Sequence, residues 1–282
     1  MYLTIGTAQF GLKYGLEKKK IKSNEIKLIN KILKRNNIIY FDTAINYGNS
    51  EKRIGELILK KKKIITKISL PEKKKINLKK WFFNVLNNSM KRLGVSKLYG
   101  ILIHNTSDIF KNSEFLDLIL QAKYKKLVSK VGVSIYEKKE LNKILKIWTP
   151  DIIQFPVNIF DQRFINKKFL QKIKKLGIET YARSCFLQGV LLKKKLHNGN
   201  YKNQVIFNKF LKWCKKNNIN QLQSCLHFVK QIKNIDSLVI GFDDSKQLKQ
   251  ILRAFNKRTI VVPYKFINNE KKLIDPRKWR VN

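Results

Sequence analysis

Residues 38–67 read IIYFDTAINYGNSEKRIGELILKKKKIITK, and this stretch gives the clearest indication of the fold class. It holds an apolar run at each end, with a polar loop and a Lys-rich amphipathic segment between them. Short apolar runs bounded by polar residues predict buried strands, and the amphipathic segment predicts a helix. A helix between two strands makes the strands parallel and covers one face of their sheet.

The same alternation repeats from one end of the chain to the other. We predict eight strands, at residues 3–8, 38–43, 63–68, 99–104, 130–134, 152–157, 178–182 and 238–241. The strands are mainly apolar throughout, as parallel strands are when helices cover one side and a barrel core the other. Eight such units favour one closed (β/α)8 TIM barrel over residues 1–282. A doubly wound sheet is disfavoured because its GxGxxG fingerprint is absent.

The gaps between the predicted strands have helical patterns. The segment SNEIKLINKILKRNN opens with a Ser/Asn cap, and its apolar face consists of Ile26, Ile29, Ile32 and Leu33. Residues 192–203 are polar and rich in turn formers, which predicts a long loop on the active side before a helix that begins near Val205. Two helical stretches then precede the last strand, which leaves room for one extra helix.

The formal charge of +42 would suit nucleic acid or an anionic membrane as a partner. Most of the 61 basic residues are lysine, however, and they are spread along the chain instead of forming a tail. Abundant Lys, Ile and Asn indicate an AT-rich coding sequence, so we favour solvated helix faces and expect no specific nucleic-acid partner. A polyanion-binding protein stays open as an alternative, and it predicts retention on DNA or heparin near physiological salt.

Three cysteines, Cys185, Cys214 and Cys225, lack CxxC spacing, and three separated histidines form no zinc pattern. We therefore expect no metal site and a reducing compartment. The first residues, MYLTIGTAQFG, lack the features of a signal peptide, and no apolar run approaches the roughly 20 residues that span a bilayer. The sequence predicts a cytoplasmic protein without a membrane span.

Three predicted strands end in ionisable residues, and a fourth such residue follows in a loop. Asp42, Lys67 and His104 end the second, third and fourth strands, and Tyr47 lies in the loop after the second. Because a (β/α)8 barrel builds its active site from the carboxyl ends of its strands, we expect the four to converge. Each alone has a structural explanation: a cap, a packed ring or an internal ion pair.

Together the four side chains suit the reduction of a carbonyl group. The reaction needs a proton donor, and a phenol with a pKa of about 10 is a weak acid unless a cation stabilises its anion. Lys67 can supply that cation to Tyr47, and Asp42 can hold the ammonium in place. His104 can then orient the carbonyl by a hydrogen bond and stabilise its developing negative charge.

With these residues in place, the sequence resembles the aldo-keto reductase family at several motifs. The matching motifs are GTAQFG, FDTAINYGNSEKRIGE, ITK, RLGVSKLYGILIH, KVGVSIY, IIQFPVN and IGFDDSKQLKQIL. The resemblance implies a nicotinamide cofactor, NADP in most members, and makes Asp42, Tyr47, Lys67 and His104 the catalytic tetrad. It also implies a set of cofactor-binding residues. We expect these to be Ser134, Gln154, Arg183, Ser184, Gly241, Asp243 and Gln247.

The chain departs from the family pattern at three places. Ile135 replaces an Asn that often binds the carboxamide, which removes one cofactor contact. Arg183 stands where a Tyr commonly stacks on the nicotinamide; it can stack in the same way or pair with a carboxylate. Asp243 and Asp244 replace residues that hold a 2′-phosphate, so NAD stays open beside NADP unless the two carboxylates only cap the following helix.

The opening TAQFGLKYG and the stretch RSCFLQG resemble a bacterial branch of the family linked to surface-sugar pathways. We therefore expect a small-molecule carbonyl, hydroxylated or sugar-derived, and anionic in view of Arg183. A regulatory or redox-sensing barrel that binds the cofactor but turns over little is the alternative. A hydrolase or isomerase is disfavoured because no Cys or Ser comes with a positioned His. The oligomeric state is left open by the sequence.

Overall fold

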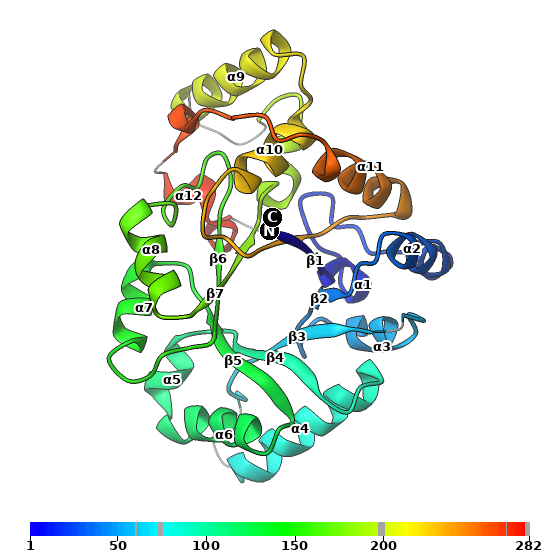
Figure 1. Ribbon diagram of the computed structural model, residues 1–282, viewed down its shortest axis with the longest axis vertical. Coiled ribbons are helices and arrows are strands. Elements are labelled where there is room, and N and C mark those ends of the chain that lie inside the picture. Colours follow the sequence, from blue (N-terminus) through cyan, green and yellow to red (C-terminus); the bar gives the residue numbers. More distant parts are fainter. Residues whose placement is uncertain (60, 73–75, 197–200, 269, 280–282) are drawn as a thin grey trace.

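The computed structural model describes residues 1–59, 61–72, 76–196, 201–268 and 270–279. Eight parallel strands close into a barrel in sequence order, with helices around the outside (Figure 1). The predicted (β/α)8 barrel is thereby confirmed. The strands are β1 (Tyr2–Gly6), β2 (Tyr40–Asp42), β3 (Lys63–Ile68), β4 (Leu98–Ile103), β5 (Val128–Ser134), β6 (Ile152–Pro156), β7 (Glu179–Arg183) and β8 (Ser237–Ile240).

The helices follow the strands and form the outer ring, with α9 farther out than α10 in Figure 1. They are α1 (Ala8–Gly11), α2 (Ser23–Arg35), α3 (Ser50–Gly55), α4 (Leu78–Leu93), α5 (Ser107–Lys111), α6 (Ser113–Tyr124), α7 (Lys138–Ile144), α8 (Lys167–Lys175), α9 (Tyr201–Lys216), α10 (Gln221–Lys230), α11 (Ser245–Asn256) and α12 (Lys271–Ile274). Short 3-10 turns occur at Leu187–Leu192, Tyr264–Phe266 and Pro276–Lys278.

Two local predictions need correction. The helix that begins at Ser23 is capped by Lys22, whose extended backbone precedes the first turn without any side-chain cap. Helix α9 begins at Tyr201 instead of near Val205, so residues 201–203 are not loop. The reason lies at Asn203, which is buried and bonded through its side chain to Asn268 and Glu270. Residues 197–200 of the predicted loop lie outside the described residues.

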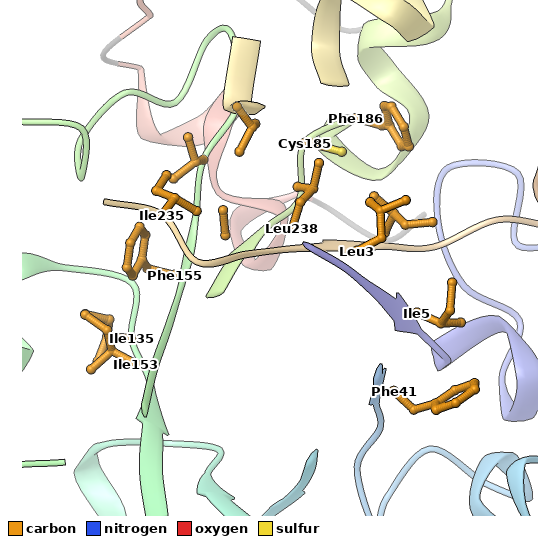
Figure 2. Close-up of a cluster of buried hydrophobic side chains, with 14 of the residues drawn as sticks. Leu3, Ile5, Phe41, Ile135, Ile153, Phe155, Cys185, Phe186, Ile235 and Leu238 are labelled. Carbon is orange, nitrogen blue, oxygen red and sulfur yellow. The ribbon is translucent and has the colours of Figure 1, made fainter. Parts of the chain in front are cut away.

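The strands pack outward against the helices and inward against one another. Figure 2 shows part of the outer core, including Leu3, Ile5, Phe41, Ile153 and Phe155. A second, smaller cluster contains buried residues from strands β3, β4, β6, β7 and β8. Its members are Ile65, Leu102, Ile152, Tyr181 and Val239.

The inner cluster positions the functional residues because side chains on one face of a strand recur every second residue. A predicted site residue follows each member of this cluster by two positions, at the carboxyl end of the strand. These are Lys67, His104, Gln154, Arg183 and Gly241. A single apolar layer inside the barrel therefore supports the polar groups at its mouth.

The other end of the barrel holds tyrosines instead of catalytic groups. The Tyr2 and Tyr181 hydroxyls are 2.5 Å apart, and Tyr99 donates its hydroxyl proton to Glu179 at 2.9 Å. Lys130 pairs with the same carboxylate. This arrangement satisfies the polar groups at the amino ends of the strands, where (β/α)8 barrels carry stability instead of catalysis.

Candidate active site

The centre of the site is a buried ion pair between neighbouring strands. Lys67 Nζ lies 2.5 Å from Asp42 Oδ2, and both side chains are at least 94% buried. Lys67 also donates to the Thr43 carbonyl at 3.2 Å, and Asp42 Oδ1 accepts from Gln154 Nε2 at 2.7 Å. These contacts fix the ammonium group at the barrel mouth. The internal pair that the sequence allowed is therefore present.

Tyr47 reaches this pair from the loop between β2 and α3. Its amide donates to the Ala44 carbonyl at 3.0 Å, and its carbonyl accepts from the Ser50 amide at 3.1 Å. Lys67 Nζ lies 5.5 Å from the centre of the Tyr47 ring. The His104 ring lies edge-on to the phenol, with 6.1 Å between the ring centres. The four predicted catalytic side chains thus come together.

Gly11 allows this loop to lie where it does. A Cβ atom on Gly11 would be 1.6 Å from the Tyr47 carbonyl oxygen and 2.7 Å from the Ser50 amide nitrogen. Only a glycine permits such a close approach of two backbones. Gly48, with φ of +56°, makes the turn that follows Tyr47.

The surroundings of the site hold Tyr47 protonated and His104 neutral. Burial raises the pKa of Tyr47 above its ordinary value, the Asp42 charge raises it further, and Arg183 acts against them. The Asp42 carboxylate offsets the ammonium that it binds, which limits the help Lys67 gives to a phenolate. Burial, with Lys67 and Arg183 nearby, lowers the pKa of His104 to about 4. At neutral pH both side chains can therefore donate a hydrogen bond.

One cavity of about 660 Å³ connects the tetrad with the residues predicted to bind a cofactor. Its size is in the range of small-molecule sites. Besides the tetrad, the lining includes Ser134, Gln154, Arg183, Ser184, Gly241, Asp243 and Gln247. The structure thus brings the tetrad and all seven residues predicted to bind the cofactor into one site.

The cavity has the polar groups that a nicotinamide carboxamide needs. Gln154 is fully buried, and its Oε1 atom has no hydrogen-bond partner among the described residues. Ser134, paired with Gln154 across β5 and β6, is 4% exposed and lines the same cavity. A buried acceptor without a partner is costly unless a ligand supplies the donor, as a carboxamide NH₂ can. Ile135 is buried in the outer core and does not line the cavity.

Arg183 lies against an aromatic ring at the mouth of the barrel. Its guanidinium carbon is 4.1 Å from the centre of the Tyr136 ring, and that of Arg277 is 3.3 Å from the same centre. Arg277 pairs with Asp275, whereas no carboxylate of the described residues lies within ion-pair distance of Arg183. Its polar contacts are long, 3.4 Å to Ser184 Oγ and 3.5 Å to the Ile135 carbonyl.

The two aspartates before α11 differ in role. Asp244 caps the helix, because Oδ1 accepts from the Gln247 amide at 2.7 Å. Asp243 lines the cavity and exchanges two hydrogen bonds with the Gln247 side chain, at 2.9 and 3.2 Å. A third carboxylate, Glu25 of α2, accepts from the Ser245 amide at 2.7 Å.

Sequence reasoning missed Glu25, Tyr136 and Arg277. Tyr136 follows Ser134 by two positions and so continues its face past the strand end, which is a signal that the spacing contains. Glu25 meets α11 because barrel closure places β1 beside β8, and α2 then packs against α11. Arg277 belongs to a 3-10 turn near the end of the chain, and this turn is too short to be predicted from hydrophobic periodicity.

A (β/α)8 barrel with a buried Lys–Asp pair, a protonated phenol and a neutral imidazole at its mouth defines an enzyme of carbonyl chemistry. The described residues contain no helix long and apolar enough to cross a membrane. The chain belongs to the aldo/keto reductase family, whose model matches residues 2–262. It is accordingly an NAD(P)-dependent oxidoreductase that acts on carbonyl groups.

Solved structures share the fold at low sequence identity. The aldo-keto reductase AKR11C1 from Bacillus halodurans, in its holo form, is 16% identical with a TM-score of 0.73, over 92% of this chain and 88% of that one. The glycerol dehydrogenase AKR11B4 from Gluconobacter oxydans is 17% identical with a TM-score of 0.69, over 92% and 87%. A search of curated proteins finds no match. These comparisons give no support to a purely regulatory barrel.

Proposed function

We propose that Tyr47 is the general acid of carbonyl reduction and the general base of the reverse reaction. The observation that carries the proposal is the buried Asp42–Lys67 pair beside a phenol that burial keeps protonated. A nicotinamide cofactor supplies or accepts the hydride when bound. Tyr47 gives its proton to the carbonyl oxygen as negative charge develops there.

The other members of the tetrad position the carbonyl group and stabilise the charges that develop during the reaction. The neutral His104 imidazole donates a hydrogen bond to the same oxygen and so fixes the carbonyl between two donors. Lys67 lies close enough to the Tyr47 ring to stabilise the phenolate left after proton transfer. Asp42 holds the Lys67 ammonium in place.

A bound cofactor would be held along the cavity by residues of β5, β6 and β7, by the loops after β7 and β8, and by the first turn of α11. We propose that Ser134 and Gln154 bind the carboxamide, and that Arg183, Ser184, Gly241, Asp243 and Gln247 line the remainder of its path. NADP is general in the family, and Asp243 keeps NAD open. We propose that residues 1–282 form one barrel domain that carries this machinery, and that it acts in the cytoplasm.

The substrate is an anionic, hydroxylated carbonyl compound such as a sugar derivative, in keeping with the surface-sugar branch. Arg183 supports this proposal because it presents a guanidinium to the cavity without a carboxylate partner among the described residues. Charged hydrogen bonds are worth about 1.5–3 kcal/mol, enough to select anionic substrates.

Arg183→Leu is expected to raise KM for carboxylated or phosphorylated carbonyl substrates about 10- to 100-fold, because it removes one charged hydrogen bond. KM for a neutral aldehyde of similar size should change less than about threefold. Steady-state kinetics on matched anionic and neutral substrates measures the difference, and Arg183→Lys should retain part of the preference. Equal losses on both substrates would show that Arg183 acts on the cofactor alone and does not select anionic substrates.

The function itself is tested by titrating the protein with NADH and NADPH while following fluorescence. Aldehydes and sugar-derived ketones are then added and absorbance of the reduced nicotinamide is recorded. Cofactor binding with turnover supports the proposal. Binding without turnover on any carbonyl favours a regulatory barrel, and absence of binding overturns the proposal.

A further inference from the structure

The cavity has two ends, and the second lies at the beginning of α11. From the tetrad it passes Gly241 and reaches Asp243, Gln247 and Gln250. In (β/α)8 barrels the loops after strands seven and eight commonly bind phosphate. If the nicotinamide lies at Gln154, as the proposed function requires, the adenosine ribose of the cofactor falls at the α11 end.

The first turn of a helix normally attracts anions. Its amide groups have no partners within the helix, and the helix dipole adds a partial positive charge. A 2′-phosphate would find favourable donors at such a place. In α11, however, protein carboxylates already use these donors: Asp244 accepts from the Gln247 amide and Glu25 from the Ser245 amide.

Glu25 reaches this position from a different part of the chain. It lies in the first turn of α2, 220 residues before Ser245, and the two helices pack together. Hydrogen bonds from Ser245 lower the pKa of Glu25, and Lys22 and Lys249 lower it further. The Glu25 side chain is therefore a carboxylate at neutral pH. The positive charges of Lys22 and Lys249 stabilise this carboxylate.

We propose that Glu25 closes the 2′-phosphate position at α11 and makes this enzyme prefer NAD(H) to NADP(H). A phosphate there would lie beside Asp243, which lines the cavity, and would find the Ser245 and Gln247 amides already bonded to Glu25 and Asp244. A free ribose 2′-hydroxyl, in contrast, can donate to the Asp243 carboxylate, which lines the cavity. Repulsion between like charges and the loss of hydrogen-bond donors both weaken the binding of NADP(H). The dissociation constants should therefore differ by about tenfold or more in favour of NAD(H), and a tenfold difference corresponds to about 1.4 kcal/mol.

The test is a pair of dissociation constants, for NADH and NADPH, measured by fluorescence titration without substrate. The wild-type protein should bind NADH at least about tenfold more tightly. Glu25→Gln removes the charge but keeps an acceptor for Ser245, and Glu25→Ala also frees the amide. Binding of NADPH should therefore tighten from wild type to Gln to Ala, by about tenfold in all, while binding of NADH stays within about twofold.

Glu114→Gln is the matched control, because Glu114 is an exposed glutamate in the first turn of a different helix, α6. It should leave both dissociation constants unchanged. Melting temperatures recorded for each variant check that the barrel is intact. Tighter binding of NADPH by the wild type, or an unchanged ratio in both Glu25 variants, overturns the inference. If neither cofactor binds, the proposed function fails as well, which separates the two conclusions.

Discussion

Tyr47→Phe is expected to lower kcat for carbonyl reduction by about 100- to 10,000-fold, the range that a positioned general acid contributes. The phenylalanine ring keeps the packing against His104 and Lys67 but has no proton to give. The dissociation constant of the cofactor should change less than about threefold, because the proposed partner of the Tyr47 hydroxyl is the carbonyl of the substrate and not the cofactor. Single-turnover measurements with saturating cofactor give the loss directly.

Tyr99→Phe is the control for this variant. Tyr99 is also a barrel tyrosine whose pKa is raised by burial, but it lies at the opposite end and donates to Glu179. Its loss should cost about 1 kcal/mol of stability and leave kcat unchanged. If Tyr47→Phe retains more than about a tenth of the wild-type kcat, Tyr47 is not the proton donor.

Gly11→Ala is expected to have the second large effect, on both stability and turnover. The added methyl group would lie 1.6 Å from the Tyr47 carbonyl oxygen, so the loop that carries Tyr47 must move. Overpacking of this kind costs about 1–3 kcal/mol or more. A shift of about 1 Å in a catalytic group can reduce turnover about 100-fold. Thermal unfolding and steady-state kinetics measure the two effects.

Gly177→Ala separates backbone strain from steric contact. Gly177 has a φ of +72° but nothing within 4 Å of an added Cβ atom. Its substitution should cost about 1 kcal/mol through backbone conformation alone and leave kcat unchanged. A Gly11→Ala enzyme with wild-type turnover would contradict the role of this contact in placing Tyr47.

The barrel and three members of the tetrad follow from the strand pattern alone. Seven of the eight apolar runs end near a predicted site residue, and the carboxyl ends of all strands in a (β/α)8 barrel meet at one mouth. Asp42, Lys67 and His104 were therefore predictable once their strands were. Tyr47 could not be predicted from the strand pattern, because it lies in a loop five residues beyond Asp42. The resemblance to a family supplied its role.

The remaining features depend on contacts between segments far apart in the sequence. The hydrogen bond from Ser245 to Glu25 forms only because the barrel closes, and no local sequence pattern in α2 predicts it. The early start of α9 follows from Asn203 binding Asn268 and Glu270, which lie 65 and 67 residues later. The state of Tyr47 is likewise set by burial and by Asp42, neither of which periodicity can measure.

The apolar layer inside the barrel limits where protons can travel. The side chains of Ile65, Leu102, Ile152 and Val239 and the ring of Tyr181 separate the tetrad from the tyrosine hydroxyls at the far end. The Tyr181 hydroxyl is engaged with Tyr2 at that far end. Protons that Tyr47 loses must accordingly be replaced through the open side of the cavity, which substrate and cofactor share. Proton exchange between Tyr47 and bulk water therefore depends on the arrival and departure of ligands. Tyr47 is reprotonated once in each catalytic cycle, when the cavity is open.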